Sequence, residues 1–473
     1  MNIKKTFLFY DYETFGVHTS LDKISQFACI RTDFQFNIIG DPVLLYCYPP
    51  IDYLPNPDSV LITGITPLDI PHDHGMIESD FSKKIYDIFN KPNTCILGYN
   101  NITFDDEFTR NLFYRNFIDP YECFWKNNNS KWDVINILRA CYVLSPSGFN
   151  WPVNDLGMPI FRLSDFSKLN DIEHVHVHNA MSDVYATVSV LEILKIKKPN
   201  LFSFLYFYRK KKRVLNFINN MFSKPLLYIS NIFGSKNNNV SIVIPILWHP
   251  INSNILVVLD LMKNIGLLLN ILHNTMYRYN TTLSQLFTCG IVFVHINKCP
   301  VLINESYLTK DNANRLSICQ SVYLNNLKIF HKYIFFIKKK ITEYFLVNKL
   351  LMDSNNVDMQ LYKNFFTYKD QSLIKIIRCC TPQALSRNTY NFKDIRLHEL
   401  LFRFRARNYF CTLNAHEKIL WNQYCRSVVT YDRFDQYKKN IQFLLIKYKF
   451  NIKKIFLLRK LWLYIQYVMS NIY

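Results

Sequence analysis

Two acidic residues near the N-terminus have the spacing of paired metal ligands. Asp11 and Glu13 follow the apolar run 7–10, which predicts a buried strand. Side chains two positions apart on a strand point to the same face, so both carboxylates project together. Neighbouring carboxylates repel each other, and a hard divalent cation with oxygen ligands relieves that repulsion. The pair therefore predicts a magnesium site; the alternative is a solvated turn at the strand end.

Three later positions supply further candidates. Asp105 falls at the start of a predicted helix, where an acid either caps free backbone N–H groups or binds a metal. Asp183 stands at another helix entrance, five residues after His178, so this histidine could lie over whatever the acid binds. His174, His176 and His178 alternate along one segment, which also fits zinc, but no clustered soft ligands accompany them.

Strands and amphipathic helices must position these side chains. The runs 24–32 and 44–48 predict two strands that continue an antiparallel meander from 7–10. A short apolar strand at 94–99 ends just before Asp105. Helices are expected at 79–89, from Phe104, from Trp132, from Ser164 and from Met181 to Pro199.

The second half of the chain has a different pattern. Residues 209–213 form a dense basic run, which is either a solvated helix face or a nucleic-acid contact. A small, mostly β module is expected between Lys224 and about Val301. Its predicted elements are strands at 241–248, 254–261 and 290–296 and a helix at 265–272. The pattern beyond Asp353 is wholly helical.

Charge is divided unevenly along the 473 residues. Residues 1–200 contain 17 Lys+Arg and 24 Asp+Glu, a net charge of −7. Because the whole chain has a net charge of +20, the remaining residues carry +27. An acidic module joined to a strongly basic remainder suits an enzyme that binds metal in one place and a polyanion in another. Codon bias toward lysine explains part of the excess, but not why the first part lacks it.

Composition narrows the class of protein. A chain of this length predicts two or three domains. No run of about 18 uncharged apolar residues appears and no export signal is found, so a cytoplasmic protein is expected. The twelve cysteines have no Cys-x-x-Cys spacing, which predicts reduced core residues and no zinc site.

Taken in order, the motifs resemble those of the DEDDh exonucleases of the ribonuclease-H-like superfamily. The residues that carry this resemblance are Asp11-Tyr12-Glu13-Thr14, Asn100-x-x-x-Phe104-Asp105 and His178-x-x-x-x-Asp183. Other segments resemble the bacterial exodeoxyribonuclease I family and span nearly the whole chain. They are residues 11–16, 61–67, 96–101, 295–302, 356–358 with 360–362, and 405–408.

The resemblance implies an architecture and an activity. The expected fold is an α/β ribonuclease-H-like exonuclease domain with a mixed sheet (1–198), an SH3-like β module along the DNA channel (199–350) and an all-α C-terminal domain (351–473). The implied activity is processive hydrolysis of single-stranded DNA from the 3′ end. This releases 5′-mononucleotides and implies a role in DNA repair and recombination.

The resemblance also implies roles for particular residues. Asp11, Glu13, Asp105 and Asp183 would hold two Mg²⁺ ions, which Mn²⁺ could replace, and His178 would take the proton from the attacking water. Glu13 would also contact the terminal nucleotide. The other implied substrate contacts are Arg110, Tyr121, Trp125, Arg139 and Arg162, supported by Asp133. Arginines that pair with phosphates and aromatic rings that stack on bases suit a channel without sequence preference.

One position departs from the family's pattern. Ser145 stands where a basic residue would help to receive the acidic tail of single-strand-binding protein, although Lys224 is retained. That partner is therefore in doubt on sequence grounds. A monomer without a membrane partner is expected.

Two other functions compete with this interpretation. A DEDDh ribonuclease that trims RNA ends would share the motifs, but such enzymes can lack a long basic C-terminal part. A non-catalytic nucleic-acid-binding scaffold would not need the complete set of four acids and a histidine, because acidic groups repel phosphate.

Overall fold

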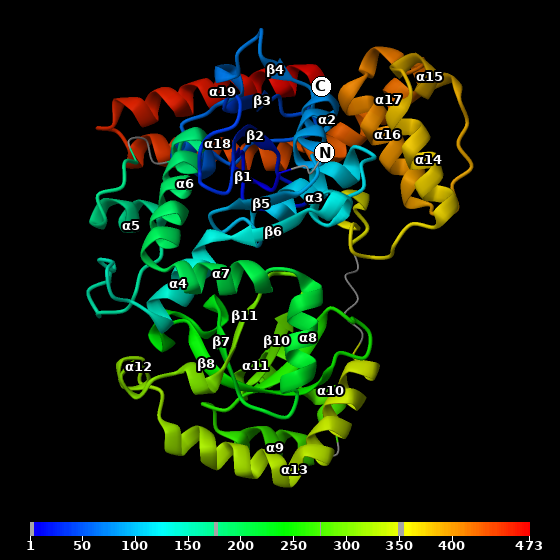
Figure 1. Ribbon diagram of the computed structural model, residues 1–473. Helices are drawn as coiled ribbons and strands as arrows, with labels where there is room; N and C mark the ends of the chain where they lie inside the picture. Colours follow the sequence, from blue (N-terminus) through cyan, green and yellow to red (C-terminus); the bar gives the residue numbers. More distant parts are fainter. Residues whose placement is uncertain (1–3, 175–177, 275, 349–353) are drawn as a thin grey trace. The chain divides into compact units, whose positions relative to one another are not determined.

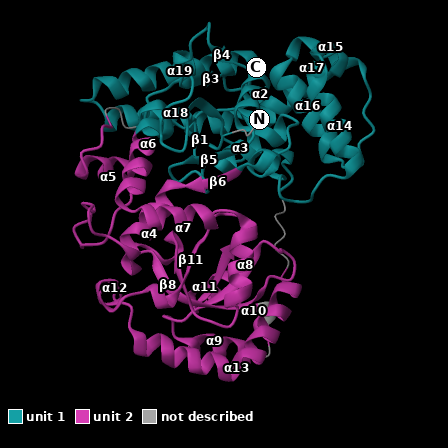
Figure 2. Cartoon of the chain, in the orientation of Figure 1, with its two compact units in different colours: residues 1–129, 175–185, 352–473 teal, residues 130–174, 186–351 magenta. Residues whose placement is uncertain are grey.

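The computed structural model describes residues 4–174, 178–274, 276–348 and 354–473 (Figure 1). They pack into two compact units (Figure 2). Unit 1 contains residues 1–129, 175–185 and 352–473, and unit 2 contains 130–174 and 186–351. Helix α6 (Ala180–Lys197) begins in unit 1 and continues into unit 2. The predicted boundaries of three consecutive domains stay a prediction.

A mixed sheet forms the centre of unit 1. The strands of this sheet that lie in unit 1 are β1 (Thr6–Thr14), β2 (Ile24–Thr32), β3 (Val43–Cys47), β4 (Gly75–Met76) and β5 (Thr94–Gly98), in the order β4-β3-β2-β1-β5. The predicted meander is confirmed, because β2 pairs antiparallel with both β1 and β3. Strand β5 pairs parallel with β1, which makes the sheet mixed, as expected.

Strand β1 is longer than the apolar run that predicted it. It continues through Asp11 and Glu13 to Thr14, and Glu13 pairs with Gln26 of β2 just before a bulge. The two acids therefore lie on the strand and not in a turn beyond it. The neighbouring apolar residues hold this part of β1 in the core, where Tyr10 and Tyr12 pack against Phe27 and Phe108.

Gly98 lets β5 end close to β1. A Cβ atom at this position would lie 2.6 Å from the backbone oxygen of Tyr10. The backbone N–H of Gly98 donates to Asn101 Oδ1 at 3.0 Å, which turns the chain toward α3 (Asp105–Arg115). The absent side chain therefore positions the helix that carries Asp105.

Helices complete unit 1. Near the sheet lie α1 (Pro57–Thr63), the short 3-10 helix η1 (Pro67–Asp69) and α2 (Glu78–Phe89). The C-terminal part of the unit is helical, as predicted, with α14 (Tyr368–Cys379), α15 (Pro382–Arg387), α16 (Arg396–Asn408), α17 (Ala415–Val428), α18 (Tyr431–Lys447) and α19 (Ile452–Ile472). Leu457, Leu458 and Leu461 of α19 pack with Phe15, which follows β1, and with Val60 of α1.

A buried ion cluster lies inside unit 1. Arg407 of α16 donates to Asp52 at 2.8 Å and to Asp358 at 2.6 Å. Arg403 reaches the same Asp358 carboxylate at 2.9 Å. Asp52 precedes α1 and Asp358 precedes α14, so these ion pairs join the sheet region to the C-terminal helices.

A second buried pair extends the cluster. Arg115 of α3 binds Glu78 of α2 through two nitrogens, the shorter contact being 2.7 Å. Burial would raise the pKa of Glu78, but Arg115 and Lys23 lower that pKa to about 2. Burial, together with Arg115 and Arg407, lowers the pKa of the Lys23 ammonium to about 8.

Unit 2 has an antiparallel sheet in the order β10-β9-β8-β7-β11. The strands are β7 (Leu226–Ile229), β8 (Val240–Trp248), β9 (Ile255–Asp260), β10 (Ile291–His295) and β11 (Val301–Asn304). The three predicted strands correspond to β8, β9 and β10, and α9 (Ile265–His273) matches the predicted helix. The four-residue strands β7 and β11 are too short to give a periodic signal.

The other elements of unit 2 are mainly helical. They are β6 (Ser130–Asp133), α4 (Val134–Leu144), α5 (Leu163–Leu169), α7 (Pro199–Tyr208), α8 (Lys211–Met221), α10 (Tyr277–Asn280), α11 (Leu283–Thr288), α12 (Lys310–Arg315) and α13 (Gln320–Val347). The basic run 209–213 lies at the junction of α7 and α8, where Arg209 covers the ring of Tyr206. Within the described ranges, no helix is both long enough and apolar enough to cross a membrane.

Candidate active site

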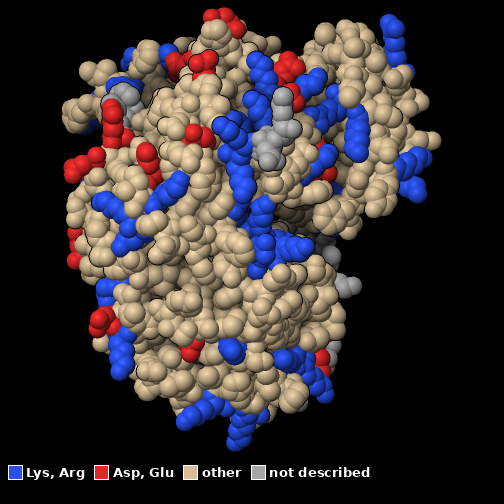
Figure 3. All heavy atoms as spheres, viewed as in Figure 1, with Lys and Arg blue, Asp and Glu red and all other residues tan. Residues whose placement is uncertain are grey.

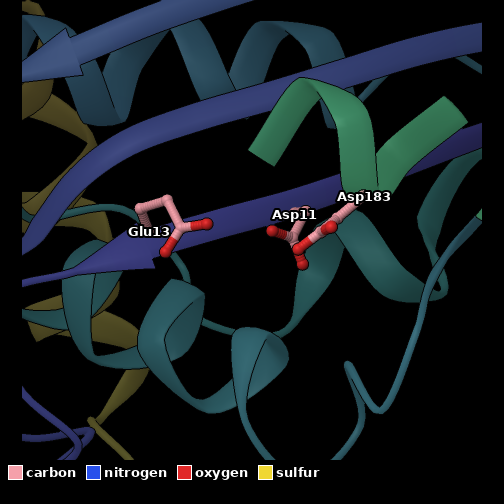
Figure 4. A group of neighbouring side chains, drawn as sticks. All are labelled: Asp11, Glu13 and Asp183. Atoms are coloured by element: carbon pink, nitrogen blue, oxygen red, sulfur yellow. The ribbon is translucent and has the colours of Figure 1, made fainter. Parts of the chain in front are cut away.

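Three carboxylates converge in unit 1, as Figure 4 shows. Asp11 and Glu13 project from β1, and Asp183 comes from the first turn of α6. Each offers an oxygen atom, and these atoms all lie within 4.8 Å of one another. Residues that are far apart in the sequence thus form one cluster of hard oxygen donors, which is the ligand chemistry that Mg²⁺ prefers.

Asp105 lies beside this cluster. Its Oδ1 accepts a hydrogen bond from the backbone N–H of Tyr12, at 3.2 Å, between the two acids of β1. The side chain is buried at the start of α3, where the helix dipole stabilises negative charge. The predicted grouping of Asp105 with β1 is therefore present, while its role as a metal ligand stays a prediction.

The carboxylates oppose one another's ionisation. Burial raises the pKa of Asp11 well above its usual value, and Asp105, Glu13 and Asp183 raise it further. Burial, Asp183 and Asp105 likewise raise the pKa of Glu13 to about 8. A divalent cation would remove this repulsion and leave all the carboxylates ionised at neutral pH, so the donor set fits a divalent metal.

His178 lies on the turn before α6. Its side chain is exposed, and its φ of 62° places the backbone in the left-handed region. His176 falls outside the described residues, as do its two neighbours. The role of His178 as the base stays a prediction, and its exposure leaves the imidazole accessible to water.

Arg110 is held by two residues that the sequence did not single out as site residues. It donates to Glu107 Oε1 at 2.6 Å and to the Tyr362 hydroxyl at 3.3 Å. The Tyr362 hydroxyl also donates to the other Glu107 oxygen. Tyr362 comes from the C-terminal part of the chain, within the segment 360–362 that carried part of the family resemblance. That match was the only sequence signal for it.

Behind Arg110 lies the buried carboxylate of Asp106. It accepts hydrogen bonds from the Tyr10 hydroxyl at 2.7 Å and from Asn101 Nδ2 at 3.0 Å, and it lies 3.9 Å from Arg110. The first turn of α3 therefore has two adjacent acids with different surroundings. Asp105 faces the β1 carboxylates, and Asp106 ties α3 to Tyr10 and Arg110.

Two predicted aromatic contacts also lie in unit 1. Trp125 is 67% exposed, which is unusual for a tryptophan side chain. Tyr121 is partly buried and packs edge-on against Phe365, with ring centroids 6.0 Å apart. An exposed indole and a ring fixed by a neighbour are both suitable surfaces for stacking on bases.

Three predicted residues belong to unit 2. Asp133 caps α4 by accepting the backbone N–H of Ile135 at 3.2 Å. Arg139 donates to Asn136 at 2.8 Å and covers the ring of Phe161. Arg162 is largely exposed, 3.9 Å from Asp165. Their predicted contacts with substrate and with the metal site stay predictions.

Two basic side chains lie near Ser145, the position that departs from the family's pattern. Lys198 Nζ donates to Ser145 Oγ at 2.8 Å. Arg315 donates to the backbone oxygen of Tyr142 at 2.7 Å and covers the Tyr142 ring. More widely, Lys and Arg are the prevalent charged side chains on the face shown in Figure 3.

Protein-family models match three consecutive parts of the chain. An Exonuclease model matches residues 8–191, an Exonuclease I SH3-like domain matches 209–346, and an Exonuclease I C-terminal domain matches 355–468. The expected order of an α/β exonuclease domain, an SH3-like module and a helical C-terminal domain is therefore confirmed.

Whole-length relatives agree. The chain is 43% identical to exodeoxyribonuclease I of Escherichia coli (strain K12) over 465 residues, which cover 98% of both proteins. It is 45% identical to exodeoxyribonuclease I of Buchnera aphidicola subsp. Schizaphis graminum, over 97% of this chain and 95% of the relative.

Solved structures show the same likeness. A crystal structure of E. coli exonuclease I in complex with a dA16 oligonucleotide superposes with a TM-score of 0.92 at 42% identity. It covers 98% of this chain and all of that one. An ExoI/SSB-Ct complex matches with a TM-score of 0.91 at 42% identity, again over 98% of this chain and all of that one.

Proposed function

The chain belongs to the exodeoxyribonuclease I family, and from that premise we propose that it degrades single-stranded DNA processively from the 3′ end, releasing 5′-mononucleotides. The observation that carries this proposal is the convergence of Asp11, Glu13 and Asp183, with Asp105 hydrogen-bonded to the backbone between the first two. The family also implies dependence on a divalent metal.

We assign the metal site to Asp11, Glu13, Asp105 and Asp183, which would hold two Mg²⁺ ions; Mn²⁺ would serve in their place. The bound metal supplies an activated water and stabilises the leaving 3′ oxygen. His178 accepts the proton of the attacking water, and Glu13 also contacts the terminal nucleotide. These assignments are supported by the donor chemistry of the cluster and by the exposure of His178.

Other side chains bind the strand without reacting. Arg110 and Arg162 pair with phosphates, as does Arg139, whose planar guanidinium suits phosphate oxygens. Tyr121 and Trp125 stack on bases, and Asp133 orients its neighbours through the cap that it forms on α4. These contacts are made to phosphates and to the faces of bases. Because sequence is read at the base edges, the enzyme binds single-stranded DNA without sequence preference.

The test compares three 5′-labelled substrates: a single-stranded DNA oligonucleotide, the matching duplex, and RNA of the same sequence, each with Mg²⁺ or chelator. We expect that only the single-stranded DNA is shortened, and that it is shortened only when Mg²⁺ is present. Asp183→Asn, which keeps the side-chain shape, should lower the rate by at least about 100-fold while binding persists. Shortening of the RNA but not of the DNA would indicate a ribonuclease. Binding of the substrates without any shortening would indicate a non-catalytic scaffold.

We also propose a contact with the acidic tail of single-strand-binding protein in unit 2. Lys198 supplies the positive charge that the family residue would have at Ser145, because its ammonium donates to the hydroxyl of Ser145. Arg315 adds a second positive charge over the ring of Tyr142. Lys198→Ala should weaken binding of an acidic tail peptide by about 10-fold, because a charge-assisted contact is lost. Fluorescence anisotropy with a labelled peptide measures this, and unchanged affinity would remove Lys198 from the proposed contact.

A further inference from the structure

An exposed apolar surface covers the outer side of the helical hairpin α18–α19. We name it the hairpin face. Its side chains include Phe450 and Ile452, which are 89% and 84% exposed at the connection between the helices. The hairpin face consists of Phe443, Ile446, Phe450, Ile452, Phe456, Leu463 and Tyr467.

This exposure is not needed to hold the hairpin in place. A separate stripe that includes Leu444, Leu457, Leu458 and Leu461 is buried against Phe15 and the residues around it. Ile452, Phe456, Leu463 and Tyr467 recur on the other side of α19 at helical spacing. A helix with an apolar stripe on its solvent side as well as its core side has a surface available for a partner.

The charge of the hairpin defines that partner. From residue 436 to the end of the chain there is no Asp or Glu. The Lys and Arg residues in this stretch are Lys438, Lys439, Lys447, Lys449, Lys453, Lys454, Arg459 and Lys460. Among the residues that the structure describes, only Lys460 of these forms an ion pair with an acid, Asp69. The positive charge of this stretch favours an anionic occupant.

Aromatic and basic groups alternate at the connection. Lys449 Nζ lies 4.8 Å from the ring centre of Phe450, and Lys454 Nζ lies 3.9 Å from that of Tyr448. A second copy of the chain cannot use the same face, since two sets of lysines would meet. A single strand of nucleic acid presents both phosphates and unpaired base faces, and thus matches the lysines and the exposed rings together.

We propose that the hairpin face binds the single-stranded DNA substrate itself, at nucleotides that have not yet reached the carboxylate cluster. This inference rests on the proposed function. The hairpin packs on Phe15, two residues beyond Glu13, so the face belongs to the same compact unit as that cluster. Long strands gain affinity from the hairpin face, and strands too short to extend beyond the cluster do not.

Binding is measured in an Asp183→Asn background, which keeps the strand intact. The oligonucleotides have about 6 nucleotides, near the lower end of single-strand site sizes, and about 30 nucleotides, well beyond their upper end of about 16. The variant is Lys449→Ala/Lys453→Ala/Lys454→Ala, and Lys83→Ala/Lys84→Ala on α2 is the control at other exposed lysines. For the long strand, log K falls as log salt rises. The triple variant should make this slope less negative by about 2, at roughly 0.7 per lost phosphate contact. The control slope should not change.

Phe450→Ala tests the ring separately, because this exposed side chain contributes little to folding. The ratio of affinities for long and short strands should fall at least about 5-fold, as for one lost stacking contact. Unchanged ratios and slopes overturn the proposal. So does Phe450-dependent binding to phosphatidylglycerol vesicles with DNA affinity unaffected, which would assign the face to a lipid surface. Cleavage of the short strand by the unmodified protein tests the proposed function independently.

Discussion

Trp125 and Arg110 represent two kinds of predicted substrate contact. Trp125 is 67% exposed, so most of its side chain faces solvent. Arg110 is buried, and its guanidinium is fixed by Glu107 and Tyr362. A change at Arg110 therefore disturbs both folding and binding, whereas a change at Trp125 separates them.

Trp125→Ala should leave the free energy of unfolding within about 0.5 kcal/mol of the original value, as for other exposed positions. It should raise KM for single-stranded DNA roughly 5- to 100-fold, since base stacking contributes about 1–3 kcal/mol per base. Urea unfolding and steady-state cleavage measure the two quantities. Leu156→Ala, at an 80% exposed leucine, is the control for lost apolar surface. An unchanged KM would remove Trp125 from the substrate contacts.

The sequence identified most of the cluster because its signals are local. The period-2 spacing placed Asp11 and Glu13 on one face, and the order of motifs added Asp105 and Asp183. The pairing of Glu107 with Tyr362 could not be predicted, because the two residues are 255 positions apart and each lies in an ordinary helix or loop pattern. Lys198 beside Ser145 was missed for the same reason.

Among the elements, β1 and β5 matter most for the position of the acids. The sequence predicted both strands but ended β1 too early, because acidic residues have low strand propensity. Pairing with β2 on one side and burial of Tyr10 and Tyr12 outweigh that propensity. The parallel contact with β5 on the other side then depends on the small size of Gly98.

Gly98→Ala should separate the end of β5 from β1 and shift Asp105, because the new Cβ would meet the Tyr10 oxygen. We expect a loss of about 1–3 kcal/mol in stability, typical of overpacking, together with a clear fall in kcat. Gly40→Ala is the control: its φ of 72° also disfavours alanine, but nothing lies within 4 Å of the added atom. Thermal unfolding should register both substitutions, and full cleavage activity in Gly98→Ala would contradict the account of β5.

At the scale of the whole molecule, unit 1 is held together by buried charges as well as by apolar packing. The cluster of Lys23, Glu78, Arg115, Asp358 and Arg407 joins the sheet region to the C-terminal helices. None of these pairings follows from sequence periodicity, since the partners come from distant segments. Removing Arg115 leaves the Glu78 carboxylate as an uncompensated buried charge, at a cost of roughly 3–5 kcal/mol.

Lys23 gives this cluster a measurable pH dependence. The pKa of its ammonium is about 8 in the folded protein, against 10.5 ordinarily, so the unfolded chain binds more protons between these values. The contribution of Lys23 to stability therefore rises with pH from about 8 to 10.5, by about 3 kcal/mol in total. Lys23→Met should remove this rise. Urea unfolding of both proteins at a series of pH values measures the difference, and parallel curves would contradict the shift.

The contact of α19 with Phe15 brings together the two ends of the chain. During synthesis β1, which carries Asp11 and Glu13, emerges long before α19, so its apolar surroundings stay incomplete until α19 leaves the ribosome. Such distant contacts form late in folding. The nascent chain thus carries every acidic residue of the cluster long before it has a finished core to hold them. Nuclease activity should accordingly appear only after α19 has been made, and a transcript truncated before the α19 codons should yield an inactive product.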